Sequence, residues 1–255
     1  MMAMELFSLA GRTALVTGAS SGLGRRFAEV LARAGASVAL AARRKDQLDR
    51  AADEISKNGG RAVAVTMDVR DVQSVAAGFA AAEAALGTVT VLINNAGVAG
   101  SGPSLETTEN DWDKVMDVNL KGAFFVATEA ARRMVAAKKA GAIVNIASIA
   151  GMLAAGGIVP YAVSKAGIDH LTRNLAQEWA RHGIRVNAIA PGYFTTDLNR
   201  EFLASPAGEA IQKRIPLRRF GEEGDLDGAL LLLASDAGRF MTGSSVVVDG
   251  GQLVG

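Results

Sequence analysis

Short apolar runs alternate with longer amphipathic stretches along the whole chain. Seven runs rich in β-branched residues or Ala are predicted strands: Thr13–Thr17, Ser37–Ala41, Ala62–Thr66, Val89–Ile93, Ala142–Ile146, Arg185–Ala190 and Val246–Val248. The stretches between them carry apolar residues at helical spacing, as Phe27, Val30 and Leu31 do in a helix predicted over about 22–34. This alternation indicates an α/β fold with about seven parallel strands, doubly wound so that helices cover both faces of the sheet.

No linker or low-complexity segment interrupts the pattern, so residues 1–255 are predicted to form a single domain. Long helices are expected around Asp111–Ala137 and Tyr161–His182. The periodicity breaks down over Phe194–Phe220, which contains two prolines and several glycines and charged residues. Long irregular insertions often cover a ligand, so we predict a substrate lid at about 194–220.

Composition narrows the possible functions. The formal net charge is +1 and no basic block stands out, so no nucleic-acid role is expected. The apolar stretches are shorter than the ~18 residues of a membrane helix, and Met1–Gly11 lacks a basic segment, so neither spanning nor export is predicted. With no cysteine and only His170 and His182, no metal site is expected, and a cytoplasmic location is predicted.

A glycine-rich turn follows the first predicted strand. Its sequence is Gly18-Ala19-Ser20-Ser21-Gly22-Leu23-Gly24, and a helical pattern comes directly after it. Glycines allow a tight turn and a close approach of the backbone to a pyrophosphate, which the free amides of a helix N-terminus stabilise. The order strand, turn, helix therefore predicts a dinucleotide site of the Rossmann type, with a simple tight connection as the alternative. The predicted contacts are Gly18, Ser20, Ser21, Gly22, Leu23 and Gly24.

The end of the second strand bears on the choice of dinucleotide. Ala42 stands where an acidic residue would bind the adenosine 2'-hydroxyl of NAD, whereas Arg43 can bind the 2'-phosphate of NADP. NADP(H) is therefore predicted in preference to NAD(H), although Arg43 and Arg44 are also plausible solvated residues at the start of a helix. After the third strand, Asp68 and Val69 are predicted to contact the adenine, with a helix cap as the alternative.

Tyr161 and Lys165 are four residues apart on one predicted helix, and this spacing places them on the same face. A phenol ionises near pH ~10, and a nearby ammonium lowers its pKa, which suits acid-base catalysis. Ser148 lies just past the fifth predicted strand and adds a hydroxyl. Read singly, the pair is also compatible with a chance spacing and Ser148 with a capping serine.

Taken in order, these motifs resemble the short-chain dehydrogenase/reductase family over nearly the whole chain. The resemblance rests on these residues: Thr17 to Gly24, Asn94-Asn95-Ala96-Gly97, Asn119, Ser148 with Tyr161 and Lys165, and Pro191-Gly192 with Thr196. It implies the catalytic residues Asn119, Ser148, Tyr161 and Lys165. It also implies further cofactor contacts: Asn95, Ala96, Gly97, Tyr161, Lys165, Pro191, Gly192, Phe194 and Thr196.

The resemblance further implies an NAD(P)(H)-dependent oxidoreductase. Tyr161 would be the general acid in the reduction of a ketone, Ser148 would polarise its oxygen, Lys165 would bind the nicotinamide ribose and Asn119 would hold a water that relays protons. A homotetramer is expected, with the two long helices as interface candidates. An NAD-linked alcohol, sugar or hydroxysteroid dehydrogenase is the enzymatic alternative, and a non-catalytic dinucleotide sensor is an alternative of another class.

The substrate is less determined than the reaction. The chain is similar to 3-oxoacyl-carrier-protein reductases, but the same motifs serve many ketones, sugars and steroids. A partly apolar pocket is predicted from Met152, Leu153, Ala154, Ile158, Tyr193, Phe194 and Phe202. A basic entrance for a carrier-bound acyl group is considered at Lys213, Arg214, Arg218 and Arg219. The alternatives are loop packing for the first set and scattered surface charge for the second.

Overall fold

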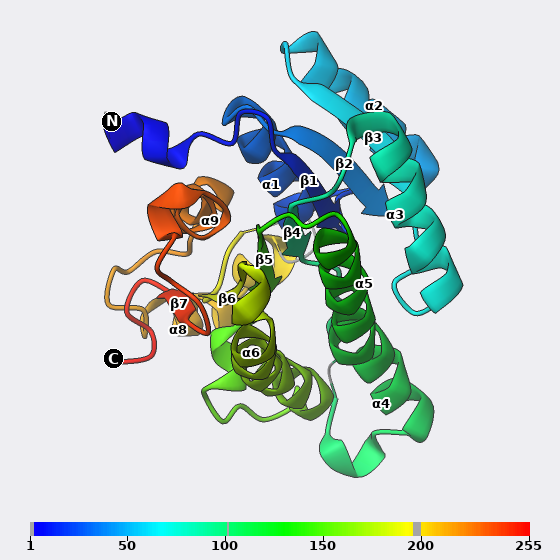
Figure 1. Cartoon of the computed structure of the whole chain (residues 1–255). Helices are drawn as coiled ribbons and strands as arrows, with labels where there is room; N and C mark the ends of the chain where they lie inside the picture. Colours follow the sequence, from blue (N-terminus) through cyan, green and yellow to red (C-terminus); the bar gives the residue numbers. More distant parts are fainter. Residues whose placement is uncertain (1–2, 101, 196–199) are drawn as a thin grey trace.

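A seven-stranded parallel sheet forms the centre of the molecule (Figure 1). The computed structural model describes residues 3–100, 102–195 and 200–255. Its strands run in the order β3-β2-β1-β4-β5-β6-β7, and every pairing is parallel. Their bounds are β1 (Thr13–Thr17), β2 (Ser37–Ala42), β3 (Arg61–Thr66), β4 (Val91–Asn94), β5 (Gly141–Ile146), β6 (Ile184–Pro191) and β7 (Ser245–Val248). The predicted fold class is confirmed, and the strand ends differ from prediction by at most two residues, at the start of β4.

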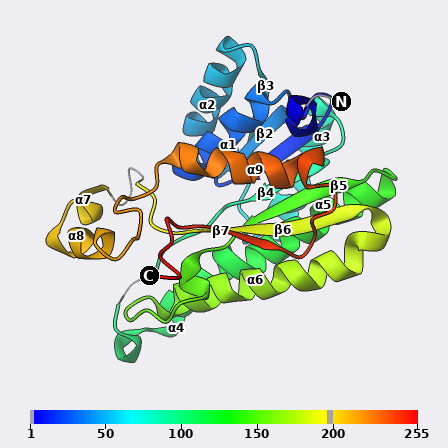
Figure 2. The same cartoon turned by 90° about the vertical axis from the view of Figure 1, so that its left-hand side faces the viewer.

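Helices cover both faces of this sheet (Figures 1 and 2). The helices are α1 (Gly22–Arg33), α2 (Lys45–Lys57), α3 (Val72–Leu86), α4 (Glu109–Met116), α5 (Ala123–Ala136), α6 (Val159–Trp179), α7 (Arg200–Leu203), α8 (Pro206–Gln212) and α9 (Asp227–Ala234). Apolar residues of α1, α2 and α9 pack on one face, and those of α3, α5 and α6 pack on the other. Adjacent strand residues serve opposite faces, as expected for a pleated strand: Ala14 and Val16 belong to the first core and Leu15 to the second.

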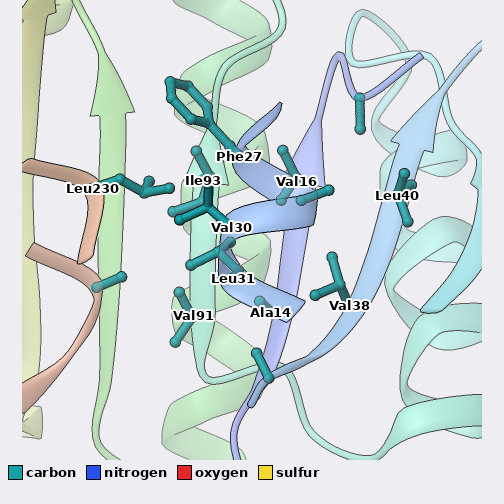
Figure 3. Packing of buried hydrophobic residues seen from close by; sticks show 14 of the residues in the cluster. Ala14, Val16, Phe27, Val30, Leu31, Val38, Leu40, Val91, Ile93 and Leu230 are labelled. Carbon is teal, nitrogen blue, oxygen red and sulfur yellow. The ribbon is translucent and has the colours of Figure 1, made fainter. Parts of the chain in front are cut away.

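The core between α1 and the sheet shows why the sequence pattern was readable (Figure 3). Phe27, Val30 and Leu31 of α1 lie over Val16 and Ile93, and all five side chains are at most 4% exposed. Burial of such side chains is the main stabilising contribution to folding, at about 25 cal/mol per Å² of apolar surface. The core therefore fixes α1, and with it the turn that precedes α1, against β1 and β4.

Two predicted regions differ from the structure. The helix expected at Asp111–Ala137 is interrupted by a π-helical segment, η3 (Asp117–Gly122), between α4 and α5. Gly122 lets this wider turn pack closely, since a Cβ there would lie 3.0 Å from the carbonyl oxygen of Val69. The segment predicted as an irregular lid contains the short helices α7 and α8, which project beyond the strand ends (Figure 2).

The strand order reverses between β1 and β4, and in open α/β sheets ligands bind at the carboxyl ends of strands beside such a reversal. The glycine turn follows β1 and the Asn95-Ala96-Gly97 motif follows β4, so both lie at this edge. Within the described part of the chain, no helix has the length and hydrophobicity needed to cross a bilayer.

Candidate active site

The glycine turn packs closely on itself. A Cβ at Gly24 would lie 2.4 Å from the carbonyl oxygen of Gly18, so this turn requires glycine at position 24. Gly18 and Gly22 adopt φ values of +68° and +52°, in the left-handed region that favours glycine. No atom lies within 4 Å of a Cβ built on Gly22, and Ser21 makes no side-chain cap on α1. Open space beside uncapped helix amides fits the pyrophosphate of a dinucleotide.

Thr17 joins this turn to the motif after β4, a role that the sequence did not reveal. Its fully buried hydroxyl accepts hydrogen bonds from the amides of Asn95 and Ala96, each at 3.0 Å. In return, Asn95 Nδ2 donates to the carbonyl oxygen of Thr17 at 2.9 Å. Asn95 and Ala96 are thus tied to the glycine turn, as expected for residues predicted to line one cofactor.

Two arginines at the end of β2 reach different parts of the same region. Arg43 is exposed and contributes to the low pKa of the Asp68 carboxyl. Arg44 Nη2 donates to the hydroxyls of Ser20 and Ser21 at 2.9 and 3.0 Å. The sequence favoured Arg43 alone, whereas the structure places Arg44 directly on the glycine turn.

Asp68, predicted to contact the adenine, is held by Arg70. The Arg70 guanidinium hydrogen-bonds the carboxylate and is the main cause of its lowered pKa, and the two charges are 2.6 Å apart. The Asp68 amide donates to Ser74 Oγ at 3.0 Å. The carboxylate does not cap the next helix, because Asp71 is the N-cap of α3.

Ser148 and Tyr161 come together at the carboxyl end of β5. Ser148 Oγ accepts a hydrogen bond from the Ala150 amide at 3.1 Å, so it caps the short helix η4 (Ile149–Gly151). The same hydroxyl hydrogen-bonds the Tyr161 phenol, which lowers the pKa of Tyr161, but burial outweighs this and the pKa lies above its ordinary value. The lowering expected from Lys165 is therefore not seen: the phenol is governed by burial and by Ser148.

Lys165 is buried one helical turn beyond Tyr161. Its Nζ donates to the carbonyl oxygen of Ile146 at 2.7 Å and lies 5.7 Å from the centre of the Tyr161 ring. Burial lowers the pKa of Lys165 to about 8. A Cβ built on Gly97 would lie 3.7 Å from this Nζ, so the Asn95-Ala96-Gly97 motif passes directly beside the ammonium.

Asn119 lies in the π-helical segment η3 and holds the chain after this motif. Its Oδ1 accepts from the Val98 amide at 2.8 Å, and its Nδ2 donates to the Val98 carbonyl oxygen at 2.9 Å. The Nδ2 also donates to Ser164 Oγ at 3.1 Å, and that hydroxyl donates to the carbonyl oxygen of Tyr161. The Asn119 side chain therefore links the segment after β4 to α6 and has both of its polar atoms engaged.

A second buried polar chain supports the same elements and was missed by the sequence reasoning. Asn94 Nδ2 donates to the Ala123 carbonyl oxygen and to Asn145 Oδ1, and Asn145 Nδ2 donates to Thr172 Oγ1. All three polar residues are at most 5% exposed. The Asn94-Asn95 doublet pointed to a family motif, but only the fold shows Asn94 facing inward to join β4, β5 and α6.

Beyond β6, the backbone is fixed on both sides. The Gly192 amide donates to the Val248 carbonyl oxygen at 2.9 Å, and a Cβ on Gly192 would lie 2.8 Å from Asp249 Cα. Phe194 is 5% exposed and pairs with Gly221 in a parallel bridge. Tyr193 lies near enough to Tyr161 to affect the pKa of that phenol. Thr196 and the side chain of Phe202 lie outside the described residues.

The two sets considered for substrate binding differ in exposure and partners. Met152 and Leu153 are exposed apolar side chains, at 40% and 37%. In the basic set, Arg219 forms an ion pair with Asp225 and Arg218 donates to the Lys213 carbonyl oxygen. Two of the four cations considered for a carrier protein thus have partners within the chain.

Comparison with known proteins gives matches over almost the whole chain. A family model described as enoyl-(acyl carrier protein) reductase (adh_short_C2) matches residues 18–252. Gluconate 5-dehydrogenase of Gluconobacter oxydans (strain 621H) is 41% identical over 251 residues, which cover 98% of each chain. 2-Dehydro-3-deoxy-D-gluconate 5-dehydrogenase of Escherichia coli (strain K12) is 37% identical over 253 residues, covering 99% of each.

A solved structure agrees with these matches. The gluconate 5-dehydrogenase from Burkholderia cenocepacia J2315, in complex with NADP and tartrate, is 37% identical, with a TM-score of 0.95 and full coverage of both chains. The resemblance seen in the motifs is confirmed by this agreement in sequence and in fold. The chain therefore belongs to the short-chain dehydrogenase/reductase family, whose members oxidise alcohols or reduce carbonyl groups with NAD(P).

Proposed function

We propose that the chain reduces a ketone to a secondary alcohol with NADPH, with Tyr161 as general acid, and catalyses the reverse oxidation with NADP. One observation carries the proposal: Ser148, Tyr161 and Lys165 meet at the carboxyl end of β5, beside the motif that is tied to the glycine turn. Bound NADPH supplies the hydride, so the protein has to orient the carbonyl and provide its proton.

Tyr161 and Ser148 handle the substrate oxygen. The raised pKa of Tyr161 keeps the phenol protonated at neutral pH. The phenol can then donate its proton to the carbonyl oxygen when the carbonyl carbon accepts the hydride. Ser148 Oγ accepts from the Ala150 amide and bonds the Tyr161 phenol, and its proton would polarise a substrate oxygen bound between the two hydroxyls. Capping and catalysis are compatible because a hydroxyl both accepts and donates.

Lys165 and Asn119 support the proton transfer from Tyr161. The ammonium of Lys165 has one bond to the Ile146 carbonyl oxygen, and its other protons can bind the nicotinamide ribose hydroxyls. The Asn119 side chain is engaged with Val98 and Ser164, so we assign any proton relay here to the backbone of Asn119 in the π-helical segment, a kind of segment that is frequent at functional sites.

NADP(H) is the dinucleotide that the charges favour. Arg43 is exposed at the end of β2, and Arg44 lies on Ser20 and Ser21, so two guanidinium groups flank the place of the adenosine ribose. The NADP bound by the Burkholderia relative supports the same choice. We assign the remaining contacts as predicted, including Leu23, Val69 and Pro191.

We propose that the chain assembles into a homotetramer. A homotetramer is supported by exposed apolar side chains on the paired helices: Phe124 and Val135 on α5 and Val163 on α6. Two surface hollows line these helices, which suits helix packing between copies. Light scattering should return four times the 26.3 kDa of one chain.

We also propose that residues 194–220 act as the substrate lid. The absence of cysteine suits a location in the cytoplasm.

A sugar acid is a second candidate substrate, favoured by the names of the relatives from Gluconobacter and Escherichia.

The test of the proposed function is the oxidation of NADPH in the presence of a panel of ketones, followed at 340 nm. Turnover with NADPH faster than with NADH is expected. Tight NADPH binding without turnover of any carbonyl would instead support a dinucleotide sensor.

A further inference from the structure

Three short segments adjoin Ser148 and Tyr161, through the chain or through a contact, and are the candidates for the walls of the substrate site. The first, residues 152–158, runs directly from η4, which Ser148 caps, to α6, which carries Tyr161 in its first turn. The second, residues 97–100 and 102–105, is joined to the first where the Gly102 amide donates to the Gly157 carbonyl oxygen at 2.8 Å. The third is Tyr193, next to Tyr161.

The first segment has only apolar side chains. It reads Met152-Leu153-Ala154-Ala155-Gly156-Gly157-Ile158, and Met152 to Gly156 are exposed. Whichever way each residue is turned, the segment can offer a substrate only Met, Leu, Ala or Ile side chains and backbone groups. An exposed apolar loop beside catalytic groups is the expected wall for an apolar substituent.

The second segment carries no charge either. Residues 97–105 read Gly-Val-Ala-Gly-Ser-Gly-Pro-Ser-Leu, and Leu105 is fully exposed. The first ionisable residue after it is Glu106, which would repel a carboxylate. Neither segment therefore provides a cation for an acidic substrate.

Three cations on neighbouring elements of the described chain have other partners. Lys165 is bonded to Ile146 and is assigned to the ribose, and Arg219 is paired with Asp225. Lys121 is paired with Asp117. A carboxylate bound against these two segments would lose its hydration without gaining a charge-assisted hydrogen bond from them.

From these walls we infer that the substrate is an uncharged ketone, or its secondary alcohol, with apolar substituents, rather than a keto acid. This inference rests on the proposed function and decides between its two candidate substrate classes. The inferred substrate class differs from the sugar acids for which two of the relatives are named.

The test compares ketones matched in shape but not in charge. 5-Methylhexan-2-one and 4-oxopentanoate share the same methyl ketone and differ only in an isopropyl or a carboxylate end. L-Sorbose and 5-keto-D-gluconate form the polyhydroxylated pair, which differs in a hydroxymethyl or a carboxylate end. At constant ionic strength with NADPH, kcat/KM for 5-methylhexan-2-one should exceed that for 4-oxopentanoate by at least about tenfold, the typical effect of a missing charge-assisted hydrogen bond.

Placing a cation on the apolar wall sharpens the comparison. Met152→Arg and Leu153→Arg should shift the preference toward 4-oxopentanoate by about tenfold, mainly through KM. Leu153→Gln is the matched control, because it adds polarity without charge and should move the ratio of the two ketones much less than Leu153→Arg does. If neither Arg variant moves this ratio, residues 152–158 are not the substrate wall and the inference is wrong.

Different results would refute the inferred substrate class and the proposed function. If wild-type protein prefers 4-oxopentanoate or 5-keto-D-gluconate to its neutral counterpart, the inferred substrate class is overturned while the proposed function stands. If no ketone is turned over with either dinucleotide, the proposed function is overturned and the inference with it.

Discussion

Two regions that meet at Tyr161 are built in opposite ways. On one side, the buried base consists of Lys165, Asn119 and Ser164, which are at most 5% exposed and bonded to backbone groups of β5, of the segment after β4 and of α6. On the other side, the apolar wall of residues 152–158 exposes Met152 at 40% and Leu153 at 37%. The base has almost no freedom to move, whereas the wall makes few side-chain bonds.

The contrast indicates how chemistry and substrate choice are separated. A buried polar group is costly unless it is bonded, so the base tolerates few substitutions. An exposed apolar wall tolerates many, since surface substitutions usually change stability by less than about 0.5 kcal/mol. A family can therefore keep one reaction and change its substrates, which suits a chain that shares its fold with sugar-acid dehydrogenases.

The largest effect is expected where the two regions meet. Tyr161→Phe should lower kcat by about 10²-fold or more, because the general acid is lost while the ring is kept. NADPH binding, measured by fluorescence titration, should change little. Activity close to that of the wild type would show that another group supplies the proton and that Tyr161 does not join base and wall.

A comparable free-energy effect is expected from the charge in the base. Burial lowers the pKa of Lys165 from 10.5 to about 8. Below pH 8 both folded and unfolded chains bind the proton; between about 8 and 10.5 only the unfolded chain does, so the free energy of unfolding should rise with pH, by on the order of 3 kcal/mol.

The variant Lys165→Met isolates this contribution. Urea denaturation of the protein without added dinucleotide, from pH 7.5 to 10.5, should show a rise for the wild type that is smaller in the variant. If the free energies of unfolding of the two proteins changed with pH in parallel, burial would not destabilise the Lys165 ammonium. Water would then reach the buried base more freely than its geometry indicates.

A smaller effect is expected at the exposed adenosine end. Arg43→Ala and Arg44→Ala should each lower kcat/KM for NADPH by about 10-fold to 100-fold, with little change for NADH, because a charge-assisted bond to the 2'-phosphate is lost. Arg50→Ala is a matched control on α2, since Arg50 is exposed and paired only with Asp46. An equal loss with both dinucleotides would assign these arginines to the shape of the turn instead.

The smallest effect is expected where the lid joins the segment after β6. The rings of Tyr193 and Phe220 are 6.4 Å apart, and such pairs contribute about 0.5–1.5 kcal/mol. Phe220→Leu should therefore raise the KM for the ketone several-fold with kcat nearly unchanged. Phe240→Leu provides the control, because that ring is fully exposed. A fall in kcat without a change in KM would place Phe220 with the base rather than with the lid.

Much of the fold could be predicted because its signals are local. β1, the glycine turn and α1 are consecutive, and the spacing of Phe27, Val30 and Leu31 is set by the helix itself. The pairing of Tyr161 with Lys165 is likewise a property of one helix. Ser148 was expected beside them because the family resemblance groups the three residues in one active site.

The remaining features depend on contacts between distant residues. Asn119 reaches the Val98 backbone across 21 positions, and Thr17 reaches Asn95 across 78. The π-helical segment has ordinary helical spacing in the sequence and is distinguished only by what packs on it. The rise in the pKa of Tyr161 could not be predicted either, because it follows from burial.

The parallel bridge between Phe194 and Gly221 has an evolutionary consequence. The Gly221 amide donates to the Tyr193 carbonyl oxygen and the Thr195 amide to that of Gly221, both at 2.9 Å, so the two ends of the intervening chain are stapled together. Doubling the length of a flexible loop costs only about 0.6 kcal/mol. Segments of different length can thus be exchanged at this staple without displacing β6, which makes it a natural junction for recombining specificities.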